Sequence, residues 1–484
     1  MKGSRWLYLG ALALALAIGF GGFHPLKVKA SPSSTATPTF QVDPTWPKPL
    51  PATVYPAAAP YTPNDKLSHM WVSGEIAGSC VDQNGHVYTF NRGWEVGIVP
   101  PGSPTGTTAQ GSESGAIDGE DATASAIPSP PVVAYDQSGN VVDYFGDPTL
   151  IANPMPNFGA AEYLPQGAHG CFVDYRGNIW VGGNGDGIVQ KYSLSEKGTS
   201  PNGYPGAYKL QIGTKGMCDG TAASTPAAVF PTCNETNDNN TSHTLLNEPA
   251  DIAVDPDPDP VTNQPGDIYI ADGYGNHRVV VFDANGNYLR QWGTSCGMNS
   301  INCPGGTFGA TGGGHPHCVV LGNDGMIYVC DRPNSRIQVF AKNCGSASTS
   351  SNPQPTCTPV RIIPINNFPS ASAANQASIL AAGTRACDMD FWPNVDYLAS
   401  KSPTDQHLVV DVDLGNDNTW ILDKASGITI GALGRCGMGP CPGHQIGEFG
   451  FGHTTTVDPS GNIYVAETIT GRRIQRFVQT GGGQ

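Results

Sequence analysis

The stretch VDPSGNIY, residues Val457 to Tyr464, contains a short apolar strand, a turn ending in glycine, and a strand with an aromatic residue. The same pattern recurs at Val81–Tyr88, Val173–Trp180 and Asn323–Tyr328, and with an Asp/Pro insertion at Val254–Tyr269. Glycine suits such turns because it adopts positive φ without steric cost, and the alternating flanks are typical of β-hairpins. The chain is therefore expected to repeat one β-hairpin unit.

Two further strands follow the hairpin in several copies. The third begins with arginine and ends with an aromatic residue at Arg278–Phe282, Arg336–Phe340 and Arg473–Phe477. A fourth follows another glycine turn, as at Tyr288–Gly293 and Tyr144–Gly146. Four antiparallel strands repeated in this way predict a propeller blade. The alternative, a β-sandwich, does not share a four-strand repeat.

The turn glycines count the blades. Successive separations of 92, 89, 59 and 136 residues join Gly85, Gly177, Gly266, Gly325 and Gly461. The last separation fits two blades, of which the first is degenerate and spans residues 385–434. The prediction is an all-β, six-bladed β-propeller with four-stranded antiparallel blades. The last blade lacks a fourth strand after Phe477, so Phe40–Asp43 is expected to pair there and close the ring.

The composition of the chain excludes some classes of function. The 484 residues carry a formal net charge of −15, only 13% are charged, and 62 Gly and 42 Pro disfavour long helices. An acidic chain lacks the basic face that nucleic acid or an anionic membrane surface attracts. We expect a monomer that acts on a small molecule or peptide.

The N-terminus resembles an export signal. Residues 1–30 have Lys2 and Arg5 before an apolar run and end at a small-residue cleavage site before Ser31. An uncleaved anchor is the alternative, because the apolar run is just long enough to span a membrane. Residues 31–60 form a Ser/Thr/Pro/Ala-rich lead-in, and the propeller is expected to occupy residues 61–484. The protein is thus expected to be secreted or periplasmic.

Thirteen cysteines agree with an oxidising compartment. Four pairs close in sequence could staple loops, although sequence does not prove their connectivity: Cys218 with Cys233, Cys296 with Cys303, Cys344 with Cys357, and Cys436 with Cys441. Five others remain, namely Cys80, Cys171, Cys318, Cys330 and Cys387. Because the total is odd, at least one cysteine is a thiol or is bonded elsewhere.

Three histidines share one position in the repeat. His169, His317 and His453 each lie eight residues before a turn glycine, in the second, fourth and sixth blades. The innermost strands start at the central channel, so these side chains are expected to converge on its axis. Three imidazoles with an open fourth position are typical of a catalytic zinc site. A coincidence of three channel histidines is the alternative. His315 lies in a different register and is expected to support the site or the loop.

Arginine and tyrosine are expected at the same mouth of the channel. Arg92 and Arg332 each lie seven residues after a turn glycine, at the end of a second strand. Two guanidinium groups beside a metal favour a substrate with a carboxylate, and blade-to-blade salt bridges are the alternative. Tyr274 lies in a Gly-flanked turn, where a cation and arginines would lower its pKa and suit it to act as a base.

The combined motifs resemble peptidyl-α-hydroxyglycine α-amidating lyase, an NHL-type six-bladed propeller family. The resemblance rests on Asn91–Gly93, Leu164–His169, Asp272–Arg278, Pro316–His317, Asp331–Arg332 and Gly452–His453. It implies a zinc ion held by the three histidines, a base at Tyr274, and Arg92 and Arg332 on the substrate side. It also implies cleavage of the N–C bond of a C-terminal α-hydroxyglycine into a peptide amide and glyoxylate, a carbon–nitrogen lyase reaction.

One departure concerns calcium. Family members often carry an aspartate after the third histidine as a structural Ca²⁺ ligand, whereas Thr454 stands here, which argues against calcium. Two alternative functions stay open: a non-catalytic NHL scaffold that binds proteins or glycans, and a metal-dependent lyase or hydrolase for another small carboxylate.

Overall fold

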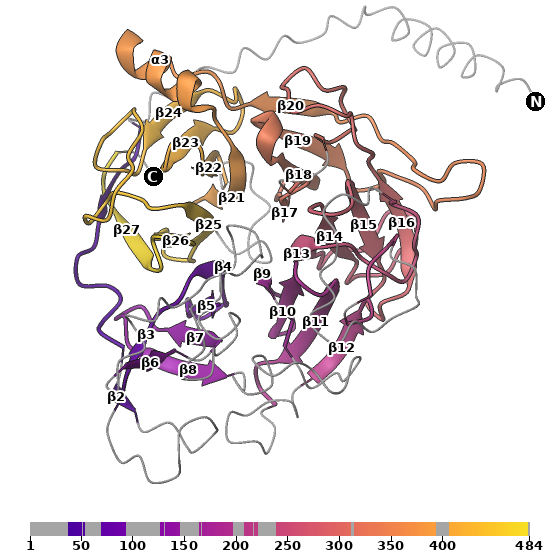
Figure 1. The fold of residues 1–484 in the computed structure, drawn as a ribbon, viewed down its shortest axis with the longest axis horizontal. Coiled ribbons are helices and arrows are strands. Elements are labelled where there is room, and N and C mark those ends of the chain that lie inside the picture. The colour runs from indigo at the N-terminus through magenta and orange to yellow at the C-terminus, as the bar shows by residue number, and fades with distance from the viewer. Residues whose placement is uncertain are drawn as a thin grey trace, which may run out of the picture. The chain divides into compact units, whose positions relative to one another are not determined.

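The computed structural model describes residues 37–50, 52–53, 69–92, 126–129, 131–145, 164–165, 167–196, 208–215, 217–220, 239–310, 314–393 and 406–482. Within these ranges six four-stranded antiparallel sheets surround a central axis (Figure 1). The predicted six-bladed propeller is confirmed.

Each blade is a meander from an inner strand at the axis to an outer strand. Blades one to three contain β4 (Ile76–Val81), β5 (Val87–Asn91), β7 (Val132–Tyr135) and β8 (Val141–Phe145); β9 (Ala168–Val173), β10 (Asn178–Gly183), β11 (Ile188–Ser193) and β12 (Tyr208–Ile212); and β13 (Pro249–Val254), β14 (Ile268–Asp272), β15 (Arg278–Phe282) and β16 (Tyr288–Trp292).

The other three blades continue the ring. They contain β17 (Cys318–Leu321), β18 (Met326–Asp331), β19 (Arg336–Ala341) and β20 (Arg361–Pro364); β21 (Ala386–Trp392), β22 (Leu408–Asp413), β23 (Asn418–Asp423) and β24 (Thr429–Ala432); and β25 (Gly452–Val457), β26 (Ile463–Glu467), β27 (Ile474–Gly481) and β1 (Thr39–Val42). The degenerate fifth blade therefore has all four strands.

The hairpin between the first two strands has a local cause. In blade two Asp174 Oδ1 accepts the backbone N–H groups of Arg176 and Asn178 at 2.9 and 3.0 Å, and Gly177 has a φ of +73°. This arrangement satisfies the turn's donors and needs glycine at its tightest point. Asp82, Asp458 and Asp136 hold other turns in the same way.

A second recurring pair fixes the opposite end of the blades. Asp272 at the end of β14 accepts a hydrogen bond from Arg278 Nε at 2.9 Å, and Asp331 at the end of β18 accepts one from Arg336 Nε at 2.7 Å. All four side chains are fully buried. Charge-paired hydrogen bonds of this kind offset the desolvation of buried ions and hold the second and third strands in register beside the channel mouth.

The N-terminal strand closes the ring, as predicted. β1 pairs antiparallel with β27, with Val42 opposite Phe477 and Phe40 opposite Gln479. The ring of Phe40 also meets Trp392 of blade five edge-on, at 5.4 Å between centroids. Beyond the strand, Asp43 forms a salt bridge with Arg476. Blade six therefore joins segments from both ends of the described chain.

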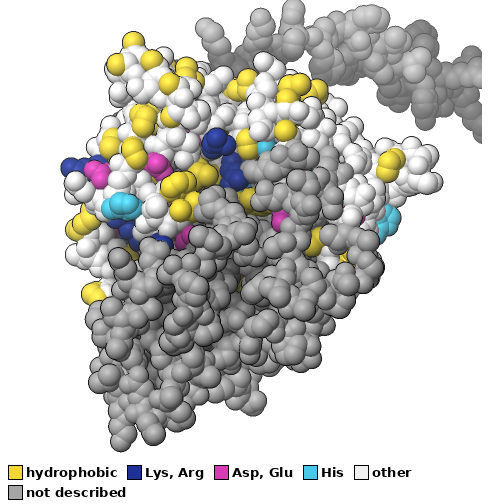
Figure 2. Space-filling view, in the orientation of Figure 1, with side chains coloured by type: hydrophobic (Ala, Val, Ile, Leu, Met, Phe, Trp, Pro, Cys, Tyr) yellow, Lys and Arg dark blue, Asp and Glu magenta, His cyan; other side chains and the backbone are white. Residues whose placement is uncertain are grey.

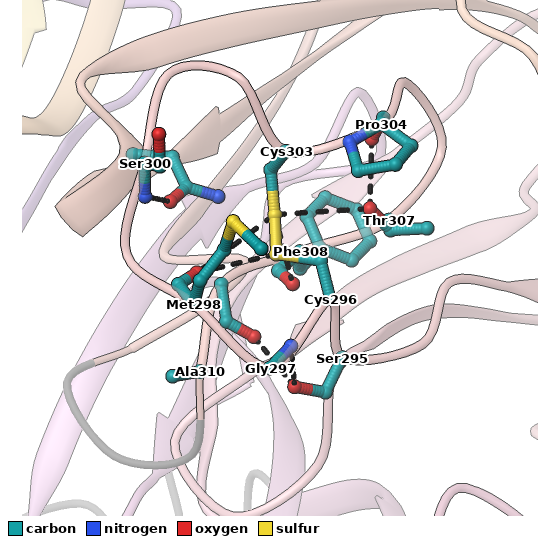
Figure 3. Close-up of a disulfide and its surroundings, with 12 residues drawn as sticks. Ser295, Cys296, Gly297, Met298, Ser300, Cys303, Pro304, Thr307, Phe308 and Ala310 are labelled. Atoms are coloured by element: carbon teal, nitrogen blue, oxygen red, sulfur yellow. Dashed lines mark hydrogen bonds between the residues drawn. A yellow bond between two sulfur atoms is a disulfide. The ribbon is translucent and has the colours of Figure 1, made fainter.

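Disulfides staple loops and neighbouring strands. Cys296–Cys303, Cys344–Cys357 and Cys436–Cys441 form within loops as the sequence suggested, and Figure 3 shows the first of them. Cys80–Cys171 joins the inner strands of blades one and two, and Cys318–Cys330 joins β17 to β18. Cys218 is also disulfide-bonded, whereas its expected partner Cys233 lies outside the described residues. Cys387 is a buried thiol outside these bridges.

Few elements lie outside the blades. The helix α3 (Ala373–Ala382) is the only α-helix among the described residues and was not expected from an all-β prediction. A small sheet combines β2 (Ala52–Thr53), β3 (His69–Val72) and β6 (Ala126–Pro128). Within the described ranges no helix is long and apolar enough to cross a membrane. The predicted signal peptide, residues 1–30, lies outside the described residues.

Candidate metal centre and active site

His169, His317 and His453 meet at the axis of the propeller. His169 and His453 lie on the inner strands β9 and β25, and His317 directly precedes β17. Each offers one ring nitrogen, and these nitrogens all lie within 4.8 Å of one another. The side chains are buried, with at most 2% exposure. The three residues aligned by the sequence repeat thus form one cluster.

The neighbouring blades orient the three rings. Nδ1 of His169 donates to the carbonyl oxygen of Ala250 at 2.7 Å, and Nδ1 of His317 donates to that of Cys387 at 2.6 Å. Nδ1 of His453 donates to Ala77 at 2.8 Å. The acceptors belong to blades three, five and one, in the positions equivalent to the histidines. Fixing Nδ1 as the donor leaves Nε2 of each ring as the available metal ligand, which is the usual role of such supporting contacts.

Burial favours the neutral, metal-binding form of His169 and His317. Burial lowers the pKa of His169 well below its usual value, and the nearby His453 and Arg92 lower it further. Burial likewise lowers the pKa of His317, together with the charge of Arg332. Neutral imidazole is the form that binds divalent metals.

Tyr274 reaches this cluster from a turn in blade three. Its hydroxyl oxygen lies 3.0 Å from Nε2 of both His169 and His317. The turn approaches closely because Gly273 and Gly275 flank the tyrosine: a Cβ on Gly273 would lie 1.8 Å from the carbonyl oxygen of Pro316. Asp272 anchors the start of the turn through Arg278. The sequence thus presents a rigid phenol to the metal site.

The donor set fits a divalent cation. Because each Nδ1 carries the proton of its carbonyl hydrogen bond, the Nε2 atoms of His169 and His317 both present lone pairs to Tyr274. A single hydroxyl proton can serve only one of them at a time. A cation bound by the converging nitrogens would satisfy these lone pairs together, and three neutral imidazoles with an oxygen donor nearby suit Zn²⁺.

Arg332 lies beside Tyr274. It opens the short 3₁₀ turn η1 (Arg332–Asn334), and its Nη1 donates to the tyrosine hydroxyl at 3.2 Å. Its guanidinium carbon lies 5.2 Å from the centre of the Tyr274 ring. A fixed positive charge here would stabilise a phenolate or attract a carboxylate at the metal.

Arg92 takes a different position. Its Nε donates to the carbonyl oxygen of Ala168 at 2.9 Å, and a terminal nitrogen lies 3.9 Å from Glu75. These contacts brace the joint between blades one and two directly behind His169. The ion pair with Glu75 lies within blade one and the contact with blade two is a backbone hydrogen bond, so neither is the blade-to-blade salt bridge of the alternative. The predicted contact of Arg92 with substrate stays a prediction.

The channel continues past the histidines as a cavity of about 200 Å³. Its walls include Asp251 and Asp388, one residue beyond the histidine position in blades three and five, which the sequence reasoning missed. Burial and the nearby Asp390 raise the pKa of Asp251 to about 7, and burial with Asp251 raises that of Asp388. Thr454 instead pairs with Ser79 across blades six and one at 2.9 Å. The repeat register places Asp251 one residue beyond Ala250, whereas Asp388 lies in the degenerate fifth blade, where the sequence has no turn glycine to count from.

The face of the propeller seen in Figure 2 carries side chains of mixed type. Basic, acidic and hydrophobic side chains are interspersed over the part of this face that the structure describes. The described part of this face therefore shows no extended surface of one charge.

One segment of the chain matches a known repeat family. Residues 314–340 match the NHL repeat. They include His315, His317, Asp331 and Arg332, the blade-four part of the site. The match agrees with the NHL-type propeller that the sequence motifs resembled.

The chain is similar in sequence to proteins whose names describe peptide amidation. Peptidyl-glycine alpha-amidating monooxygenase B of Xenopus laevis is 38% identical over 99 residues, covering 20% of this chain and 10% of that protein. A Caenorhabditis elegans protein named "Probable peptidyl-alpha-hydroxyglycine alpha-amidating lyase" is 23% identical over 269 residues, covering 55% of this chain and 56% of that protein. The alignments thus span a tenth and just over half of these relatives. The expected resemblance is confirmed: the chain is a propeller related to amidating lyases.

Two solved structures align with most of this chain at low sequence identity. A streptogramin B lyase structure aligns over 84% of this chain and 94% of its own, with 12% identity and a TM-score of 0.39. A gluconolactonase from Xanthomonas campestris aligns over 92% and 98%, with 11% identity and a TM-score of 0.39.

Proposed function

We propose that the protein is a zinc-dependent carbon–nitrogen lyase that converts a C-terminal α-hydroxyglycine into a peptide amide and glyoxylate. One observation carries the proposal: the Tyr274 hydroxyl lies within 3.0 Å of two of the three converging histidines and 3.2 Å from Arg332. Three histidines that could hold a metal thus lie beside a phenol and a guanidinium. These are the groups that the chemistry of an α-hydroxy acid requires.

The three histidines would hold the metal. Bound Zn²⁺ would supply Lewis acidity to the substrate hydroxyl oxygen. His169, His317 and His453 keep their Nε2 atoms directed to one point because their Nδ1 atoms are tied to Ala250, Cys387 and Ala77.

Tyr274 would move the proton. As a phenolate it takes the hydroxyl proton, the hydroxyl oxygen forms the new carbonyl bond, and the N–C bond breaks. The amide nitrogen receives a proton in the same event, and Tyr274 can return the one it took, so the phenolate is regenerated. Arg332 would hold the substrate carboxylate and keep Tyr274 in place through its 3.2 Å hydrogen bond.

Export belongs to the same proposal. The protein folds in an oxidising environment if its disulfides are to persist, and five of them join described cysteines. We propose that residues 1–30 are a signal peptide, followed by a lead-in and the propeller.

The test follows glyoxylate released from an N-acylated α-hydroxyglycine by the zinc-loaded protein. Tyr274→Phe should keep zinc and lose about 10²–10⁴-fold in kcat, the usual contribution of a general base. Arg332→Ala should raise KM and lower kcat, because the carboxylate loses its partner in both the ground and transition states. Tyr144→Phe removes a phenol oxygen on the outer strand β8 and is the matched control. Absence of glyoxylate from fully zinc-loaded wild type would refute the proposed reaction.

A further inference from the structure

We infer that His315 is a positioning residue that sets Tyr274 and Arg332 relative to each other, an inference that rests on the proposed function. It belongs to the Gly-His-Pro-His stretch but does not point a nitrogen into the metal cluster. Its ring is fully buried and makes a defined polar contact.

The ring of His315 contacts Asp331, the residue directly before Arg332. Its Nδ1 lies 2.9 Å from Asp331 Oδ1, and both side chains have no exposed surface. Asp331 directly precedes Arg332, so this contact fixes the backbone from which the guanidinium projects. The other oxygen of Asp331 accepts from Arg336 and Asn334, at 2.7 and 2.8 Å. Asp331 therefore keeps its blade contacts when His315 is changed.

The backbone of His315 contacts the turn that carries Tyr274. Its N–H donates to the carbonyl oxygen of Gly273 at 2.6 Å, directly before Tyr274. The carbonyl oxygen of Pro316 occupies the space that a Cβ on Gly273 would need. The turn that carries Tyr274 thus rests on the backbone of His315 and Pro316.

The His315 ring is also held from a third direction. A Cβ on Gly309 would lie 2.2 Å from Cε1 of His315, so the backbone at Gly309 covers the ring. One imidazole is therefore clamped by the loop before blade four while it links the turns of blades three and four. A displacement of about 1 Å between a base and its substrate anchor can cost about 10²-fold in rate.

The experiment compares three substitutions at one position. The amide nitrogen of asparagine lies as many bonds from Cα as Nδ1 of histidine, whereas that of glutamine lies one bond further. His315→Asn can therefore still donate to Asp331 and His315→Gln cannot do so from the same place. His315→Ala removes the donor and the ring together. Because alanine also leaves a cavity, the comparison of Asn with Gln decides the question.

Two readouts separate this inference from the proposed function. The first is KM and kcat for the α-hydroxyglycine substrate at full zinc occupancy. We expect His315→Gln and His315→Ala to raise KM about tenfold or more and lower kcat, while His315→Asn stays within about threefold of wild type. The second is amide hydrogen exchange over residues 272–276 and 331–336, which needs no turnover. There we expect faster exchange in the Gln and Ala proteins and wild-type exchange in the Asn protein.

Each result has one meaning. If wild type releases no glyoxylate, the proposed reaction fails, and the exchange pattern alone decides the role of His315. If His315→Gln and His315→Ala match wild type in both readouts, His315 does not position the site. If His315→Asn is as impaired as His315→Gln, the hydrogen bond to Asp331 is not the cause and the inference is overturned.

Discussion

The closure of the ring predicts a change in the free energy of unfolding that can be worked out from the carboxylate of Asp43. Asp43 lies just beyond β1 and pairs with Arg476 of β27. Burial opposes ionisation of Asp43, but hydrogen bonds from Arg476 and Thr45 and the charge of Arg476 outweigh it and lower the pKa from 3.8 to about 2. Asp43→Asn removes this charge and leaves the shape of the side chain.

The difference in pKa sets the magnitude. At about 1.4 kcal/mol per pKa unit, ionised Asp43 contributes at most about 2.4 kcal/mol to folding. Its side chain keeps 15% exposure, so solvent screening reduces our expectation to about 1–2 kcal/mol. Because the folded pKa is the lower one, this stability is present above pH 4. About half remains at pH 3, and the rest is lost as the pH falls through 2.

The assay is urea or thermal unfolding of wild type and Asp43→Asn at pH 7, 4 and 3. The variant should be destabilised at pH 7 and should approach wild type as the pH falls. Glu196→Gln is the control, because it removes an exposed carboxylate paired with Lys209 and should change the midpoint little. Deleting residues 31–45 should lower the midpoint further and promote aggregation by exposing an edge strand. An Asp43→Asn protein that melts like wild type at pH 7 would refute the closure argument.

Three further predictions concern metal, buried charge and processing. His317→Ala should lose zinc affinity by orders of magnitude and keep the fold, as checked by metal analysis and circular dichroism; unchanged metal content would contradict the ligand assignment. Burial, then the charges of Asp413 and Asp388, raise the pKa of Asp411 well above its usual value, and neither of its oxygens has a hydrogen-bond partner among the residues that the structure describes. Its contribution to stability therefore falls as the pH rises above about 4, and Asp411→Asn should stabilise the protein by about 1–3 kcal/mol at pH 8 and by less at pH 5. The mature protein should begin near Ser31 by N-terminal sequencing, and an N-terminus at Met1 in a membrane fraction would contradict signal cleavage.

The sequence predicted those features that the repeat itself specifies. Turns with aspartate and glycine at a fixed spacing located the hairpins, and the same spacing brought His169, His317 and His453 together at the axis. Because each blade starts at the channel, residues at the same position in each repeat lie at similar distances from the propeller axis. The residues at the equivalent positions of the other blades, such as Ala77 and Ala250, could be aligned, but their carbonyl contacts required the structure.

Contacts between distant segments that the repeat does not specify could not be predicted. Cys80 and Cys171 are 91 residues apart and pair because blades one and two place their inner strands side by side. The structural contacts of Arg92 depend on the carbonyl of Ala168, and backbone groups leave no signal in a sequence. The helix α3 lies in a loop, where its capping residue Ser372 and the following Gly383 were the available local signals.

The hydrogen bonds from the three histidines to neighbouring blades have a mechanical consequence. Each metal ligand is held by the blade that follows it, so a metal at the axis would act as a central tie across all three joints. His453 and Ala77 link blades six and one at the axis, and the ring is also closed at the rim, where β1 pairs with β27 within blade six. Weakening the β1–β27 pairing would disturb the positions of the three histidines. Metal binding at the axis would in turn stabilise that strand pairing. Metal occupancy and resistance of the N-terminal strand to proteolysis should therefore rise and fall together.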